Sequence, residues 1–259
     1  MKILKHTREN GFTLAETLVA LVVGMVLLTA IYSVVNMAQK STTGIEGKVV
    51  AQQDARVALE IMALEIRMAS YSVWADNGIW VNPATCSPQN PTYRGIRSAT
   101  ANSLTIEMDI NDDRDIADKT ITSTPPPTTN LNDENEIIAY EYLPAEQRIT
   151  RETIRCDGGS WSSSGGQPFL GPSATDPDSG GVKVINGSLN IPLYRYYNGQ
   201  GAEIYPTTAD QDEVPNIRRI AITIAVETRD ADPATGQKRT LIYGTSVTPK
   251  NHAITVGGG

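Results

Sequence analysis

An apolar run close to the N-terminus constrains this chain more than any other feature. It extends from Phe12 to Val35 and contains one charged side chain, Glu16. At a helical rise of about 1.5 Å per residue, the run would form a helix of roughly 36 Å, which is enough to cross a hydrocarbon core of about 30 Å. Basic residues precede the run, and the next positive charge after it is Lys40. This asymmetry predicts a cytoplasmic leader and an extracytoplasmic body beyond Val35.

The residues before the apolar run indicate how the leader is removed. An ordinary secretory signal has a shorter apolar core followed by a cleavage site of small residues, and neither is visible here. Residues 11–16 read GFTLAE, and they resemble the GFTLxE site of type IV prepilins. The resemblance implies that a prepilin peptidase removes residues 1–11 by cutting after Gly11. It also implies that the new N-terminal residue, Phe12, is methylated.

Glu16 lies inside the apolar run, where a carboxylate needs an explanation. An ionised carboxylate in a membrane helix costs several kcal/mol unless it is paired. By resemblance to pilins, its partner is the amine of Phe12 on the same or a neighbouring subunit, and the pair sets the axial register of assembly. The alternative is that Glu16 lies near the membrane surface and is solvated there.

Residues 36–71 predict an amphipathic continuation of the helix. Two glycines and a lack of apolar periodicity at residues 41–47 predict a bend or local melting. Beyond them, four apolar residues recur at i, i+4, i+7 and i+11 and predict a stripe that packs on a sheet. They are Val57, Ile61, Leu64 and Met68. Glu60, Glu65 and Arg67 lie off this stripe.

The same stretch resembles one group of pilins in more detail. Residues 52–71, QQDARVALEIMALEIRMASY, are similar to the QxxARxAxxxLxxDIRxAGY segment of PilW-type minor pilins. Glu65 stands where that pattern has Asp, and Ser70 stands where it has Gly. Without the resemblance, any amphipathic helix on a sheet would give this periodicity.

Residues 72–259 predict a β-rich extracytoplasmic domain. Alternating apolar residues indicate strands at 104–110, 136–143, 149–154, 217–228 and 240–248. Short turns at 144–146 and 231–237 would join two hairpins. Between the strands, polar segments at 76–97, 120–135 and 157–181 predict long loops. The expected fold class is therefore α+β, with a long N-terminal helix, transmembrane in its first half (12–35), packed on an antiparallel sheet.

Two observations restrict the function. The formal charge of −7 and a pI near 4.9, with acidic residues spread along the chain, do not suit a nucleic-acid-binding surface. The two histidines, His6 and His252, lie in the leader and the tail, which leaves the body without a histidine to act as general base. We therefore expect no enzyme and no required cofactor.

One acidic segment is a candidate calcium site. Asp109, Asn111, Asp113 and Asp115 place oxygen side chains at alternate positions, as a calcium loop does. A standard EF-hand is excluded, because Arg114 stands at its sixth position and Thr120 at its twelfth. The alternative is a solvated acidic turn between strands.

The two cysteines, Cys86 and Cys156, have no CxxC spacing and no neighbouring histidine, which argues against a metal site or a redox pair. An even number in an exported chain favours one disulfide. It would close a loop of about 70 residues and stabilise the domain by about 4 kcal/mol in the chain-entropy model. Two unpaired thiols are the alternative.

Taken together, the resemblance implies a minor pilin of the PilW type in a tip or initiation complex. Its partners would be other minor and major pilins, the prepilin peptidase and the inner-membrane assembly platform. It would be a single-pass protein of the inner membrane and then part of a pilus on the cell surface. Ser33, at the position where many major pilins have proline, fits a minor role. A J-like minor pseudopilin of type II secretion and a membrane-anchored binding module or adhesin remain as alternatives.

Overall fold

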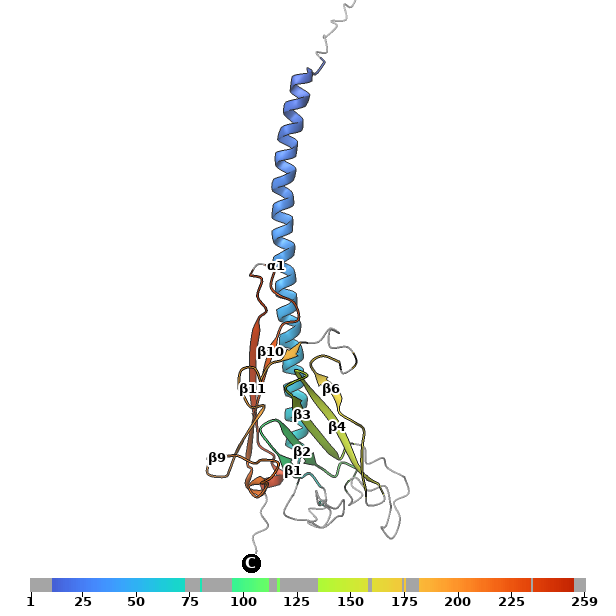
Figure 1. The fold of residues 1–259 in the computed structure, drawn as a ribbon, viewed down its shortest axis with the longest axis vertical. Helices are drawn as coiled ribbons and strands as arrows, with labels where there is room; N and C mark the ends of the chain where they lie inside the picture. Colours follow the sequence, from blue (N-terminus) through green and yellow to red (C-terminus); the bar gives the residue numbers. More distant parts are fainter. Residues whose placement is uncertain are drawn as a thin grey trace, which may run out of the picture.

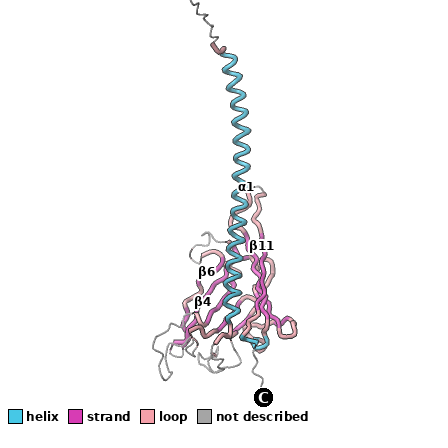
Figure 2. Tube along the Cα trace, turned by 180° about the vertical axis from the view of Figure 1, so that it is seen from behind, coloured by secondary structure: helices cyan, strands magenta, loops and turns pink. Residues whose placement is uncertain are grey.

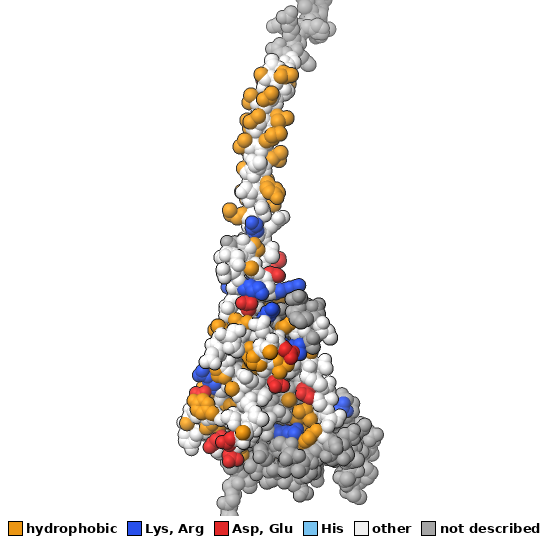
Figure 3. Space-filling view, viewed as in Figure 1, with side chains coloured by type: hydrophobic (Ala, Val, Ile, Leu, Met, Phe, Trp, Pro, Cys, Tyr) orange, Lys and Arg blue, Asp and Glu red, His pale blue; other side chains and the backbone are white. Residues whose placement is uncertain are grey.

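The computed structural model describes residues 11–72, 80, 95–111, 116, 135–157, 160–173, 175, 182–233 and 235–253. One helix, α1 (Leu14–Met68), projects from a β-rich domain that packs around its C-terminal half (Figure 1). The architecture is the α+β layout expected from the sequence. The N-terminal half of α1 extends away from the domain, and Figure 3 shows its hydrophobic side chains on the surface.

The domain contains two antiparallel sheets instead of one. The first consists of β1 (Ile96–Ala99), β2 (Ser103–Glu107), β3 (Ile137–Leu143), β4 (Arg148–Asp157) and β5 (Ser160–Ser163) in that order, and β6 (Gln167–Leu170) also pairs with β4. The second has the order β11 (Thr240–Val247), β10 (Arg219–Glu227), β8 (Tyr194–Tyr197) and β9 (Glu203–Ile204), and β7 (Lys183–Val184) also pairs with β10. Two short 3₁₀ helices are η2 (Val214–Asn216) and η3 (Asn251–Ala253).

The hairpins predicted from alternation are confirmed. β3 and β4 pair from Ile137↔Ile154 to Leu143↔Arg148 across a turn at 144–147, and β10 and β11 pair without interruption from Ile220↔Val247 to Glu227↔Thr240. The inward residues of β10 are all buried: Ile220, Ile222, Ile224 and Val226. In β2 burial does not alternate: Leu104 and Ile106 are buried as expected, but Thr105 and Glu107 between them are buried too. Beyond the strand, Met108 is buried and Ile110 is exposed.

The loop prediction for residues 157–181 is wrong in part, because β5 and β6 lie within it. Their sequences, SWSS and QPFL, are short and rich in serine or carry proline. Both are held by pairing with β4. Tertiary pairing therefore outweighs a local sequence that does not favour strands.

α1 contacts β10, β11 and β6, so it lies against both sheets (Figures 1 and 2). Its buried face is not the stripe expected from the sequence. Val57, Ile61, Leu64 and Met68 are between 36% and 59% exposed. The helix residues that enter the core are Ala51, Ala55, Ala58, Leu59, Met62, Ala63 and Ile66.

The predicted stripe was wrong because large apolar residues were taken to mark the core. Alanines at four of the buried positions remove side-chain bulk and let the helix backbone approach the strands closely. The larger residues on the opposite face remain on the surface of the described chain. Glu65, expected to lie away from the sheet, instead points toward it.

The predicted break at residues 41–47 is also wrong, because α1 is helical throughout this segment. The connection between β10 and β11 lies against it: a Cβ atom built on Gly44 would lie 3.0 Å from Oδ1 of Asp232. Arg239, at the end of the same connection, forms an ion pair with Asp232. The docked connection thus offsets the low helix propensity of glycine.

Tyrosine side chains join the two sheets. The Tyr142 hydroxyl donates to the carbonyl of Val184 at 3.2 Å and accepts from the amide of Gly187 at 2.8 Å. The Tyr196 hydroxyl donates to the carbonyl of Thr100 at 2.7 Å. These bonds make the two sheets one body around the end of α1.

Candidate assembly site

The start of α1 is built by a capping box. Thr13 is the N-cap, and its hydroxyl oxygen accepts the Glu16 amide at 3.3 Å. In return the Glu16 carboxylate accepts the Thr13 amide at 2.9 Å and the Thr13 hydroxyl at 3.0 Å. This reciprocal pattern satisfies two of the amide groups that a helix start leaves unpaired. It also holds the carboxylate at the amide of Thr13, the residue that directly follows Phe12.

The Glu16 carboxylate therefore has a geometric role that the sequence analysis did not anticipate. It is held at the helix N-terminus, where the backbone dipole favours negative charge. No described side chain of a basic residue lies within ion-pair distance of it. Its charge is thus left to an amine outside the described contacts or to solvent, the two alternatives given above.

Small residues continue the Glu16 face along the helix. Ala20 and Gly24 follow Glu16 at intervals of four residues, and together with Ala15 and Leu27 they border one shallow groove. A Cβ atom built on Gly24 would have no neighbour within 4 Å. Small residues four apart let two membrane helices approach closely. The signal for this face was present in the sequence as Ala20-Leu-Val-Val-Gly24.

α1 is the one helix in the described part of the chain that is long and apolar enough to cross a membrane. Its most apolar window is fully unburied, so no part of the described domain covers it. Phe12 is 87% exposed and Leu14 is 83% exposed. An apolar helix of this length needs a membrane or other helices to remove it from water.

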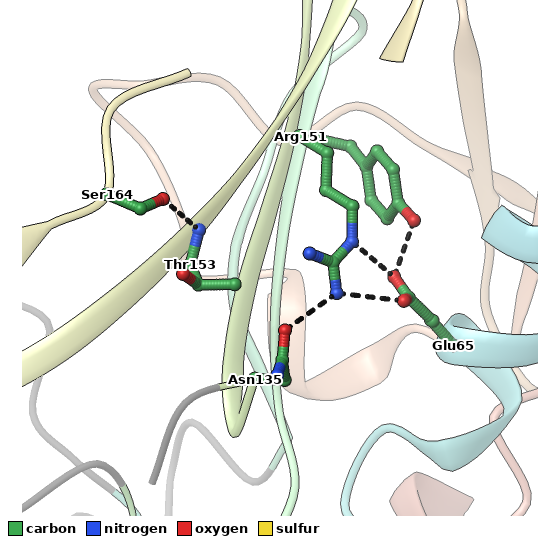
Figure 4. A network of polar contacts seen from close by, with 6 residues as sticks. Glu65, Asn135, Arg151, Thr153 and Ser164 are labelled. Carbon is green, nitrogen blue, oxygen red and sulfur yellow. Dashed lines mark hydrogen bonds and ion pairs between the residues drawn. The ribbon is translucent and has the colours of Figure 1, made fainter. Parts of the chain in front are cut away.

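A second polar cluster ties the other half of α1 to the first sheet. The Glu65 carboxylate accepts from Nη2 of Arg151 at 2.9 Å, from Nε of Arg151 at 3.3 Å and from the Tyr140 hydroxyl (Figure 4). Arg151 also donates to Oδ1 of Asn135 at 3.3 Å. We call Glu65, Tyr140 and Arg151 the helix clamp.

The helix clamp is largely removed from water. Tyr140 is fully buried, and the side chains of Glu65 and Arg151 are 18% and 24% exposed. Burial, and then the bond to the Glu65 carboxylate, raise the pKa of Tyr140. For Arg151 the largest effect is burial, which lowers the pKa, but the hydrogen bonds and charges of Glu65 and Tyr140 together outweigh it, so the pKa of Arg151 is also raised. Both groups therefore keep their protons, and the clamp fixes the helix against β3 and β4.

The residue that follows the C-terminal end of α1 by two positions, Ser70, contacts β2 and η3. Ser70 follows the helix with φ of +64°, a conformation that favours glycine. Its amide donates to the carbonyl of Glu107 at 2.9 Å, and its hydroxyl lies 3.3 Å from Nδ1 of His252. His252, which the sequence assigned to the tail and not to the body of the domain, is buried, and its Nε2 lies 3.3 Å from the carbonyl oxygen of Val214.

The remaining sequence-derived sites are only partly described. Asp109 is buried and accepts from the Ser72 hydroxyl at 3.3 Å, and Asn111 is half-buried. Asp113 and Asp115 lie outside the described residues, as does Cys86, and the side chain of Cys156 is not described. Among the residues described, no group of three or more His, Cys, Asp or Glu could hold a metal ion. The calcium site and the disulfide stay predictions.

Comparison with known proteins gives one match, confined to the N-terminus. Residues 6–32 match the family model of the prokaryotic N-terminal methylation motif. The match spans Gly11, Phe12 and Glu16 together with most of the apolar run. No curated protein and no solved structure matches the chain.

Proposed function

We propose, from the premise that the chain is a type IV pilin-like prepilin, that it acts as a minor pilin of the PilW type. It would be cut between Gly11 and Phe12, methylated at Phe12 and assembled with other pilins in a tip or initiation complex. From that complex the major pilin would polymerise. Its domain would face the extracytoplasmic side and then the cell surface.

The observation that carries this proposal is the position of the methylation motif on α1. The motif lies directly at the start of a helix that is exposed over its apolar half and continues without interruption into the domain core. A plain membrane anchor requires neither the motif nor a single rigid rod. A subunit whose helix leaves the membrane and packs among other helices requires both.

Glu16 is the proposed register-setting residue. Cleavage after Gly11 would create a positively charged amine at Phe12, next to the capping box that holds the carboxylate. The pair would form within a subunit or between neighbours, and either arrangement compensates the cost of a charge in the membrane. Ala20 and Gly24, on the same face, would let a neighbouring helix approach the pair closely.

The PilW-type assignment has support beyond the motif. Glu65 is the helix residue at which this chain departs from the Asp of the PilW pattern, and the structure places it in the helix clamp. The longer side chain still reaches Arg151 and Tyr140. Ser70 departs from the Gly of the pattern and adopts the φ that glycine favours. Both departures from the pattern are therefore compatible with this fold.

The test compares Glu16→Gln with Glu60→Gln in the native host. Glu60 is exposed on the same helix, outside the apolar run, and its side chain forms no hydrogen bond or ion pair with the described residues. We expect Glu16→Gln to reach the membrane and be cleaved, yet enter sheared fibres at least tenfold less than wild type. Glu60→Gln should enter them normally. Equal entry of Glu16→Gln and wild type would contradict the assembly role.

A deletion strain and its complemented form separate the alternatives. Loss of protein secretion with normal pili upon deletion of the gene would support a J-like pseudopilin. Normal pili and normal secretion with weaker surface attachment would support an anchored adhesin. A minor pilin predicts fewer pili upon deletion and their recovery upon complementation.

A further inference from the structure

β11 forms the edge of the second sheet, and its outer side is open (Figures 1 and 2). It pairs with β10 over eight consecutive positions without a bulge. Its sequence, TLIYGTSV, contains no charge and no proline. Charges, prolines, bulges and short length are the devices by which proteins keep edge strands from pairing with other chains. β11 has none of them.

The hydrogen-bond pattern shows which backbone groups point outward from β11. The amide of Thr228 donates to the carbonyl of Arg239 at 2.9 Å, so the carbonyl of Arg239 points toward the β10 side. Because the pattern alternates in an antiparallel pair, the next residue, Thr240, turns its amide and carbonyl away from β10. The bond from the Thr223 amide to the Leu193 carbonyl, on the opposite side of β10, agrees with this alternation.

The outward groups therefore belong to alternate residues of β11. These residues are Thr240, Ile242, Gly244 and Ser246. All four are exposed, and no described residue bonds to their amides or carbonyls. The edge thus presents a regular row of backbone donors and acceptors.

The other edge strands in the described chain are short, covered or interrupted. β5, at the end of the first sheet opposite β1, has four residues. Gln211 covers β1, because its side-chain oxygen accepts the Ala99 amide at 2.8 Å and its nitrogen donates to the Ala99 carbonyl at 2.9 Å. β6 carries Pro168 and pairs with β4 through a register shift. β7 and β9 each have two residues. The open edge of β11 is therefore an exception within this domain.

We propose that the outer edge of β11 binds an extended segment of another protein by strand addition. The occupant is an uncharged, proline-free stretch of about six to eight residues, because a row of backbone donors and acceptors is matched by another extended backbone. A single side chain satisfies only one position, as Gln211 does at Ala99. A charged side chain at the centre of the stretch would find no opposite charge on β11, whose residues are all uncharged.

A second copy of this chain in antiparallel pairing is disfavoured by geometry. The connection before β11 lies beside Gly44, and Figure 1 shows β11 descending along α1 toward its C-terminal end. β11 and α1 therefore run in the same direction. Antiparallel pairing of two β11 strands would point the two membrane helices in opposite directions, which one membrane does not allow.

The inference rests on the proposed function, because the partner is sought in the assembly that contains this chain. Hydrogen exchange of the full chain, in its detergent-extracted assembly and as a dissociated single subunit, tests it. In the single subunit we expect Leu241, Tyr243, Thr245 and Val247 to be protected and the four outward amides to exchange rapidly. In the assembly all eight amides should be protected. Unchanged exchange in β11 would overturn the inference.

Three variants at one position make the test specific to the backbone. Ile242→Pro removes an outward amide without removing a bond to β10, and Ile242→Lys adds a charge but keeps every amide. Ile242→Thr keeps both the amide and the β-branched shape. We expect at least tenfold less incorporation for the first two and normal incorporation for the third. Normal incorporation of Ile242→Pro, with the fold intact, would contradict strand addition.

The outcomes also separate this inference from the proposed function. If the wild-type chain is absent from every fibre or assembly, the proposed function fails. If it is present and β11 stays unprotected, the inference alone fails. If a purified chain forms dimers that protect β11, the occupant is a second copy, and the stated partner is wrong.

Discussion

The helix clamp allows the strength of the contact between α1 and the first sheet to be measured. Glu65→Gln keeps the shape of the side chain and an oxygen for the Tyr140 hydroxyl, but it removes the charge that faces Arg151. Hydrogen bonds to charged groups contribute about 1.5 to 3 kcal/mol, against about 1 kcal/mol for neutral ones. The retained oxygen still accepts from Nε of Arg151 but without the carboxylate charge, and the amide NH2 at the other position cannot accept from Nη2, so that bond is lost. Both side chains retain some contact with water. We therefore expect a loss of about 2 kcal/mol.

The assay is thermal unfolding of the full chain in detergent, followed by near-ultraviolet circular dichroism. For a domain of this size a loss of 2 kcal/mol corresponds to about 4 to 8 °C in melting temperature. Glu60→Gln is the matched control, because Glu60 is exposed on the same helix, and it should change stability by less than about 0.5 kcal/mol.

A double-mutant cycle isolates the pair itself. Arg151→Met should also destabilise the domain, because it leaves the Glu65 carboxylate with the Tyr140 hydroxyl as its remaining partner in the helix clamp. Combined with Glu65→Gln, it should cost about 1 to 2 kcal/mol less than the sum of the single changes. Additive single changes, or a Glu65→Gln effect equal to that of Glu60→Gln, would refute the clamp.

Further predictions concern the core, the tyrosines and the calcium site. Ala55→Leu should destabilise the domain by about 1 to 3 kcal/mol in urea unfolding, because Ala55 is fully buried against the sheets, whereas Val57→Leu on the exposed face should be nearly neutral. Burial raises the pKa of Tyr140, Tyr194 and Tyr196. Unfolded tyrosine ionises near pH 10, so above about pH 10 the unfolded state releases protons that the folded state retains, and stability falls as pH rises. Ultraviolet titration should therefore show these three phenols ionising together with unfolding; reversible ionisation of all tyrosines in the folded domain would contradict this. For the predicted calcium site, calorimetric titration of the full chain in detergent should release or absorb heat and raise the melting temperature, and the absence of both would remove the site.

The general fold could be predicted because its signals are local. The apolar run from Phe12 to Val35 requires a long helix, and the alternation in β10 requires a half-buried strand. The turns predicted at 144–146 and 231–237 follow from turn-forming residues between two alternating runs. Each of these signals depends on neighbours within about ten residues, which is the range that a sequence pattern can report.

The face of α1 that enters the core could not be predicted from size alone. The stripe that contains Ala55 and the stripe that contains Val57 both repeat with the helical period. Which of the two faces the sheets depends on how closely the strands approach the helix. The helix clamp was missed for the same reason, since Glu65 and Arg151 are brought together only by the packing of the helix on β4. The sequence did mark Glu65, because it stands where the PilW pattern has Asp, but this difference did not show which residues Glu65 would contact.

The central claim, that this chain is processed as a prepilin and built into an assembly through its new N-terminus, is tested most directly by intact mass and N-terminal sequencing. The protein would be isolated from its native host with and without the prepilin peptidase. We predict a chain that begins at methylated Phe12 when the peptidase is present and one that retains residues 1–11 when it is absent. A chain that retains residues 1–11 in both strains would contradict processing as a prepilin and reduce α1 to an anchor.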